Sequence, residues 1–388
     1  MTDSVSLGTA GGAAQTAPAR SGSLFHPIAD FIFLGGGSLV VLALFWLFLG
    51  DLPVQDIFPY VLLTAHFINH PHFAYSYQIF YRRFAAKVLG RELPGLLRAR
   101  YVFAGVVVPA ALVLFFVVCI ARGDARLIGY AGNFMVFTVG WHYAKQGYGM
   151  IIVDSVLKRL FFSQNEKRLL LLNAHVCWVL FYVWTNQSLH ETDLWGLKYY
   201  TFDFPDLLVT VLGAAALATS AATAGMLGRK WARDGGTLPL NGIAAYIASI
   251  YVWLLATKVG PLIIVAAAPA FHSLQYQYVV WRYQLNVERA RDGSGYSPGA
   301  AGKRWYLPRL ASLRFALFTI IGMAIGYLGF WAIPKYLNAA VAYDHGIFGE
   351  TMFLFVFWIF INVHHYFLDN VIWRAENPET GRHLFAHG

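Results

Sequence analysis

The chain has 388 residues, of which 58% are apolar and only 13% are charged. A soluble domain carries about 25% charged residues, so the composition excludes an ordinary soluble globule and predicts an integral membrane protein. The formal net charge of +9 would suit a nucleic-acid-binding protein, but the positions of the basic residues along the chain have another explanation.

Residues 1–22 are mostly Ser, Thr, Ala and Gly, and we expect a disordered cytoplasmic tail rather than a signal peptide. Apolar segments then recur, most of them with the ~20 residues that cross about 30 Å of hydrocarbon. They cover residues 29–49, 56–81, 101–121, 127–153, 168–187, 206–227, 240–257, 261–283, 311–333 and 350–373. The sequence therefore predicts an all-α, polytopic membrane helix bundle of about ten transmembrane helices. One membrane domain would cover residues 23–376, with a cytoplasmic tail at 377–388.

Lysines and arginines gather at one end of these predicted helices. With the N-terminus inside, the outer loops contain only five of them, Arg122, Arg126, Lys198, Lys258 and Lys335. This positive-inside bias predicts that both termini are cytoplasmic. Topology thus explains the basic charge, and no nucleic-acid partner is predicted. We expect a multi-pass protein of a bacterial-type inner (cytoplasmic) membrane, in contact with membrane lipids.

Eight of the thirteen histidines fall at similar depth in this topology. They are His26, His66, His70, His72, His142, His272, His364 and His365. A single intramembrane histidine is often a hydrogen-bonded packing residue, and we interpret His175 in that way. Ionisable groups in lipid cost roughly a few kcal/mol each unless they are satisfied. Packing alone does not require eight imidazoles at one depth, so the set predicts a metal site.

Local spacing supports convergence of these histidines. His66 and His70 are four residues apart and share a helix face. The proline that follows can kink the helix and redirect His72. His364 and His365 are about 100° apart around a helix, so both can point inward only where a pocket wraps around that helix.

Two acidic residues accompany the histidines. Asp30 lies four residues after His26, and Asp369 lies four residues after His365. Either carboxylate could orient an imidazole by accepting its N–H, or could complete a metal shell. Imidazole-rich sites with a carboxylate and no thiolate suit Fe, Cu, Zn or Ni. We favour one or two non-heme iron ions, because O₂ and apolar substrates both partition into bilayers.

Four short motifs carry a resemblance to a known family. They are Phe25-His26-Pro-Ile-Ala-Asp30, then His66-Phe67 or His72-Phe73, then His272-Ser273 with Val279-Val280-Trp281, and finally His364 with Asp369 and Val371-Ile372-Trp373. In order and approximate depth they resemble the motifs of the Brp/Blh-type membrane β-carotene 15,15′-dioxygenases. The resemblance implies a membrane-embedded, histidine-ligated non-heme iron oxygenase.

The chain also departs from that family. The second histidine of the third motif falls at Tyr276, and the second motif lacks its acidic residue. His142 and His365 have no obvious counterpart, and more helices are expected here. The resemblance therefore implies iron-dependent oxygenation more than carotene cleavage. Asp30, Asp369 and Tyr276 are the candidate catalytic residues.

The leading hypothesis is an O₂-dependent oxidoreductase that cleaves, hydroxylates or desaturates a lipid or isoprenoid, with an electron-donor protein as a further partner. Two other functions fit the residues. A proton- or metal-coupled transporter could use the histidines and Asp369 as a relay. The shared direction of the histidine helices argues against an inverted repeat but not against a parallel one. A heme-binding membrane protein could use histidine pairs as axial ligands.

Overall fold

A computed structural model describes residues 22–48, 63, 65–189, 192–194, 197–253, 261–291, 309–374 and 376–384. The predicted N-terminal tail up to residue 21 and most of the long connection at 292–308 lie outside the described residues. The described chain is almost entirely helical, which confirms the all-α prediction. Its two short strands, β1 (Thr192–Leu194) and β2 (Leu197–Tyr199), pair antiparallel with Asp193 opposite Lys198.

The helices have the following bounds, with η marking π-helical turns. They are α1 (Pro27–Phe31), η1 (Ile32–Gly36), α2 (Gly37–Phe48), η2 (Ala65–Asn69), α4 (His70–Tyr81), α5 (Phe84–Leu89), α6 (Gly95–Val102), η3 (Phe103–Val107), α7 (Val108–Ala121), α8 (Ala125–Leu157), α9 (Gln164–Leu189), α10 (Asp206–Arg233), α11 (Leu240–Ile250), α13 (Pro261–Arg291), α14 (Arg309–Tyr327), η5 (Leu328–Ala332), α15 (Ile333–Ala340), α16 (His345–Phe348), α17 (Met352–Ile372) and α18 (Pro378–Leu384).

Within the described chain, six helical segments are long and apolar enough to cross a membrane. They cover Pro27–Leu44, Gly95–Ala121, Gln164–Ser188, Asp206–Arg233, Ser312–Ala340 and Met352–Ile372. Large apolar side chains on them face outward, including Leu47 and Leu217, each at least 70% exposed. Such exposed apolar surface is typical of a protein embedded in lipid.

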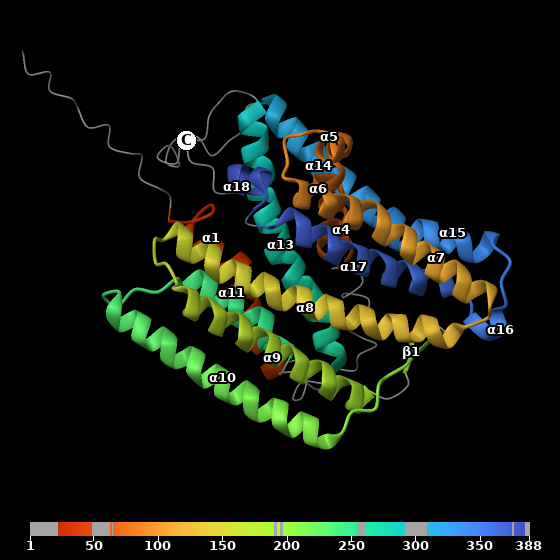
Figure 1. Ribbon diagram of the computed structural model, residues 1–388, viewed down its shortest axis with the longest axis horizontal. Coiled ribbons are helices and arrows are strands. Elements are labelled where there is room, and N and C mark those ends of the chain that lie inside the picture. The colour runs from red at the N-terminus through yellow and green to blue at the C-terminus, as the bar shows by residue number, and fades with distance from the viewer. Residues whose placement is uncertain are drawn as a thin grey trace, which may run out of the picture.

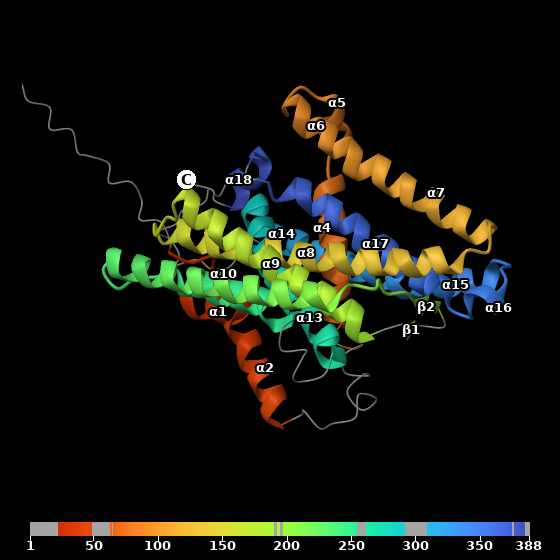
Figure 2. The ribbon, with the colours of Figure 1, turned by 60° about the horizontal axis from the view of Figure 1, so that its bottom comes forward.

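Helices far apart in the sequence pack around α17, which lies between α4 and α8 (Figure 1). On one side, α8 is followed by α11, α9 and α10, and on the other side α14 packs against α4. In Figure 2, α2 extends away from this central layer on one side, and α5, α6 and α7 lie on the opposite side, where α7 contacts α17 and α8. The middle of the bundle is therefore built by α4, α8, α13 and α17.

Glycines allow two of these contacts to be close. A Cβ at Gly322 on α14 would lie 2.2 Å from the Tyr75 ring on α4. A Cβ at Gly140 on α8 would lie 2.1 Å from the Trp178 ring on α9. Helices in membranes associate by such close packing, because lipid tails provide no hydrophobic driving force between them. Both glycines thus help to fix the helices that carry the histidines.

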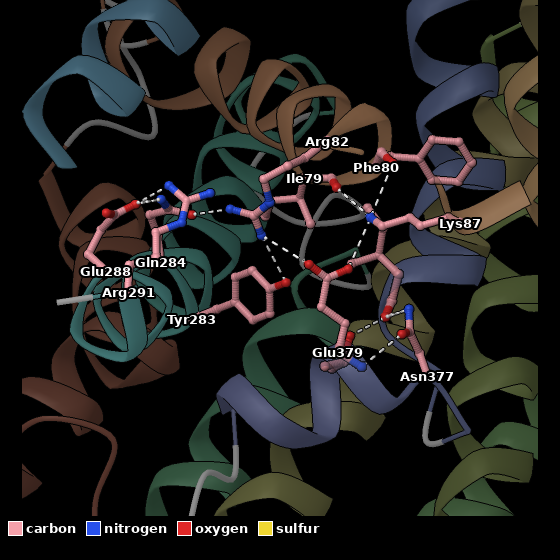
Figure 3. Close-up of polar contacts among 12 residues, drawn as sticks. Ile79, Phe80, Arg82, Lys87, Tyr283, Gln284, Glu288, Arg291, Asn377 and Glu379 are labelled. Atoms are coloured by element: carbon pink, nitrogen blue, oxygen red, sulfur yellow. Dashed lines mark hydrogen bonds and ion pairs between the residues drawn. The ribbon is translucent and has the colours of Figure 1, made fainter. Parts of the chain in front are cut away.

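At one end of the bundle, the short helix α18 is held against α4, α5 and α13 by a polar network (Figure 3). The Glu379 carboxylate pairs with Lys87 at 3.0 Å and Arg82 at 3.3 Å. Asn377 donates to the Tyr101 hydroxyl at 3.1 Å and to the last carbonyls of α17. Residues 378–384, expected as part of a tail, are thus a packed helix.

The charges of this network are only partly exposed to solvent. Burial by itself would raise the pKa of Glu379, but the Lys87 and Arg82 cations outweigh burial and hold that pKa below its usual value of 4.5. Burial lowers the pKa of Lys87 in spite of its carboxylate partner. Because the carboxylate pKa is lower in the folded state, its stabilisation is present above the unfolded pKa and is lost as the pH falls through the folded pKa.

We predict that Glu379→Gln destabilises the docked α18 by about 1–3 kcal/mol, because it leaves two partly buried cations without a countercharge. The thermal midpoint of purified protein should fall at neutral pH, and proteases should remove the C-terminus faster. The difference from the unsubstituted protein should shrink as the pH drops below 4.5.

The matched control is Glu376→Gln, whose carboxylate is 66% exposed and pairs with Arg100 and Arg374. Exposed pairs contribute less than about 1 kcal/mol, so this variant should melt like the parent. Equal effects of the two substitutions would show that Glu379 does not anchor α18.

Candidate metal centre

Four helices bring four imidazoles and one carboxylate together in the bundle interior. We call His72 (α4), His142 (α8), His272 (α13), and His365 and Asp369 (α17) the His/Asp cluster. The ring centroids of His365 lie 4.8 Å from His72 and 5.1 Å from His142. Those of His272 lie 5.3 Å from His72 and 4.9 Å from His142, which closes a ring of four imidazoles.

Seven buried polar atoms of this cluster lack hydrogen-bond partners. They are Nε2 of His72 and His142, both ring nitrogens of His272 and His365, and Oδ2 of Asp369. Each such atom costs about 1–3 kcal/mol in a folded protein, and nearly all buried polar groups avoid that cost. These atoms lie together in a group that could hold a metal ion.

The spacing of these atoms suits a metal ion. One ligand atom each from His72, His272 and His365 lies within 4.8 Å of the other two, and the same holds for His142, His365 and Asp369. Ligands on opposite sides of an ion with bonds of about 2.1 Å lie about 4.2 Å apart. Small inward movements would therefore bring these atoms to bonding distance.

Asp369 is oriented toward the cluster by hydrogen bonds to one of its two oxygens. Oδ1 accepts from the Ser76 and Tyr276 hydroxyls, both at 2.9 Å. Oδ2 lies 3.4 Å from Nε2 of His142 and 3.5 Å from Nε2 of His365. In the part of the chain that the structure describes, no lysine or arginine forms an ion pair with this carboxylate. Burying a carboxylate without a cation is costly, and a bound cation would offset that cost.

Other residues fix the orientation of the candidate ligands. The His72 Nδ1–H donates to the Asn69 carbonyl, which leaves the lone pair of Nε2 free for the cluster. Trp373 Nε1 donates to the Tyr276 hydroxyl at 3.2 Å and so supports the residue that orients Asp369. Partners of this kind set the tautomer and geometry of metal ligands.

His272 is enclosed mainly by side chains of α8 and α11. The Tyr143 ring stacks on it with centroids 3.8 Å apart. Gln146 donates to the His272 backbone carbonyl at 2.9 Å. A cavity of about 10 Å³ between Ser249, Val252 and His272 has room for roughly one small molecule such as water.

Of the eight histidines expected at a metal site, the structure brings the four of the His/Asp cluster together with Asp369 and Tyr276. The other four lie elsewhere and are His26, His66, His70 and His364. His26 is exposed at the start of α1, where its Nδ1 accepts from the Ile28 N–H. Asp30 accepts hydrogen bonds from the backbone of Leu24 and Phe25 and from the Tyr278 hydroxyl. Asp30 therefore holds the N-terminal turn against α13 and orients no imidazole.

His364 lies next to His365 but points in a different direction from α17, toward Tyr77 and Ala104. Its Nδ1 contacts the Tyr77 hydroxyl at 2.8 Å, and its Nε2 contacts the Ala104 carbonyl at 3.0 Å. Both nitrogens are occupied by these hydrogen bonds, so neither is free to bind a metal.

His66 and His70 form a separate pair, with ring centroids 5.7 Å apart. The His70 ring stacks on Phe330 of η5 at 4.4 Å. Since His70 and His72 are two residues apart on a helix, they face nearly opposite directions.

Sequence reasoning did not single out Ser76 or Asn69, and it named Trp373 only as part of a motif, without a role at the site. Ser76 lies one helical turn after His72 and Trp373 one turn after Asp369, so both share a face with a candidate ligand. That spacing could have identified them once His72 and Asp369 were chosen among the candidates.

No protein-family model, no curated protein and no solved structure matches the chain. The resemblance of its four motifs to the Brp/Blh-type dioxygenases therefore stays a prediction from the sequence.

Proposed function

We propose that this membrane protein is a non-heme iron enzyme that uses O₂ to oxidise a lipophilic substrate. The observation that carries the proposal is the convergence of unpartnered, buried ligand atoms in the His/Asp cluster. The cluster fits a cation by burial, by the types of its donor atoms and by their spacing.

The donor set supports iron. His142, His365 and Asp369 supply two imidazoles and one carboxylate, the combination typical of non-heme Fe(II) oxygenases. His72 and His272 would add two further nitrogens. Five protein ligands leave one position of a six-coordinate ion open, as catalytic metal sites require. His365 belongs to both possible groups, which favours one ion over two.

The spacing of the imidazoles argues against heme. The centroids of neighbouring rings lie 4.8–5.3 Å apart, so the four imidazoles pack closely around one small space. A porphyrin is several times wider than an imidazole and would have to separate the histidines that lie on one side of it from those on the other. A small ion needs no such space.

The roles of the chain's own residues follow from their contacts. Ser76 and Tyr276 would hold Asp369 in place, and the Asn69 carbonyl would keep His72 in the metal-binding tautomer. Bound iron would supply the one-electron chemistry that activates O₂. The apolar helices around the cluster would exclude water and bind the lipophilic substrate near the iron. Proximity would then provide much of the remaining rate acceleration.

We further infer the finer topology from loop charge. About ten spans, with both termini on the cytoplasmic side of a bacterial-type inner membrane, would put the His/Asp cluster inside the hydrocarbon. Helix α18 and its Glu379 network would then face the cytoplasm. An electron-donor protein would approach on that side.

The central prediction is that protein purified in detergent contains about one iron per chain and shows no Soret band. Elemental analysis and an optical spectrum measure both. Addition of Fe(II) to chelated protein should raise the thermal midpoint, because a ligand that binds only the folded state stabilises that state. Folded protein that neither contains nor binds iron would rule out the proposal and favour a transporter with a histidine relay.

Neighbouring histidines allow a sharper prediction. His365→Ala should weaken iron binding more than about 100-fold. Mutation of a residue that only orients a ligand costs about 10–100-fold in metal affinity, and loss of the ligand itself should cost more. The metal-free protein should remain folded, because the substitution removes two unpartnered nitrogens.

His364→Ala should give the opposite pattern. It breaks the hydrogen bonds to Tyr77 and Ala104 and should lower stability by about 1–3 kcal/mol while iron content is retained. Chelator competition and thermal melts of the two variants distinguish these outcomes. Equal iron loss in both variants would contradict the ligand assignment.

A third prediction concerns Tyr276. Tyr276→Phe removes the hydroxyl that donates to Asp369 and should weaken iron binding about 10–100-fold without unfolding the protein. The control is Tyr278→Phe on the same helix, whose hydroxyl donates to Asp30 instead. Chelator competition should leave the control unchanged, and a Tyr276→Phe variant with full affinity would remove Tyr276 from this role.

A further inference from the structure

His66 and His70 are not part of the His/Asp cluster, but both lie beside π-helical turns. They sit on and just after the π-helical turn η2, opposite the π-helical turn η5. The His66 ring lies 5.2 Å from Tyr327, and the His70 ring lies 6.1 Å from Trp331. π-helical turns are rare and occur frequently at functional sites. His70, the first residue after η2, thus contacts two residues of η5.

Two polar atoms at this meeting point are buried without a partner. They are Nδ1 of His70, a residue only 6% exposed, and Nε1 of Trp331. The indole N–H can only donate, whereas a neutral imidazole nitrogen can donate or accept. One neutral oxygen between them could bond to both, as a hydroxyl or as a carbonyl. Within the described residues, no charged side chain pairs with either group, so an ionised ligand would lack a countercharge.

An aromatic path joins this point to the His/Asp cluster. The His70 ring stacks on Phe330, whose centroid lies 5.1 Å from that of Phe73. The Phe73 ring in turn lies 4.8 Å from His365 and 3.9 Å from His72. An apolar chain that follows Phe330 and Phe73 would thus pass from the histidine pair to the candidate metal ligands.

The same place is open to lipid on its outer side. Phe67 on η2 is 54% exposed and Tyr327 at the end of α14 is 49% exposed. Both apolar rings border the histidine pair, with His66 in contact with each. A lipid-soluble molecule could therefore reach His70 from the bilayer without crossing water.

We propose that His70 and Trp331 bind the hydroxyl or carbonyl oxygen at one end of a lipophilic substrate, whose apolar chain lies along Phe330 and Phe73 toward the His/Asp cluster. This inference rests on the proposed function, because it assigns the substrate class of that site. The distance from the oxygen anchor to the cluster would select the carbon that reacts.

Photo-crosslinking tests the anchor without any measurement of activity. The full chain in lipid nanodiscs is labelled with a long-chain primary alcohol that carries a mid-chain diazirine, and labelled peptides are mapped by mass spectrometry. Label is expected on peptides that contain Phe73 or Phe330. Hexadecanol should compete about ten-fold more strongly than hexadecane, because one hydrogen bond to a buried partner is at stake.

His70→Phe and Trp331→Phe should each reduce this preference for the alcohol, while iron content stays unchanged because neither residue lies in the cluster. His175→Phe is the matched control, since His175 also stacks on an aromatic ring, Trp141, and has an unpartnered Nε2. It should keep the preference.

Equal competition by hexadecanol and hexadecane, or a preference that survives both His70→Phe and Trp331→Phe, would overturn the anchor. Iron content measured on the same preparations separates the two proposals. Iron with no alcohol preference refutes only the anchor, whereas alcohol preference without iron refutes only the proposed oxidation chemistry.

Discussion

The main constraint on this structure is the free-energy cost of burying a polar group in an apolar bundle without a hydrogen-bond partner. Most buried polar groups of the described chain have such a partner. Asn133 bonds to Asn186 and to the Tyr182 hydroxyl, and Asn173 donates to the hydroxyls of Tyr246 and Tyr251. Elsewhere in the described chain such atoms are fewer at any one place, as at His70 and Trp331, but at the His/Asp cluster seven of them lie together. A cation shared by these side chains would give each residue one partner atom, which no single hydrogen bond could do.

Helix geometry explains why neighbouring histidines serve different purposes. A step of one residue turns a side chain by about 100°, so His364 meets η3 and its hydrogen-bond partners while His365 meets the cluster. A step of two residues on α4 sends His70 toward η5 and His72 toward the cluster. In both helices, one histidine therefore faces the candidate metal centre and another faces a different neighbour.

The same geometry limits what the sequence could predict. Long apolar runs predict helices, and histidines within them predict buried imidazoles, so the helical class follows directly from composition and spacing. Which of eight histidines converge depends on how each helix is rotated, and apolar helices that face lipid carry little pattern to fix that rotation. The π-helical turn η2 adds to the difficulty, because its wider turn shifts the faces of the residues that follow, including His72.

The cluster and the C-terminal anchor are mechanically connected through the last turn of α17. Asp369 lies in that turn, and Trp373, which ends it, donates to Tyr276. The following residues are fixed to the same turn, since Asn377 and Thr380 both donate to the Ile372 carbonyl. Glu379 then ties them to Arg82 and Lys87 beyond α4. If α18 detached, the end of α17 would be free to move. The position of the Asp369 carboxylate therefore depends on a charge network that lies outside the membrane-spanning segments.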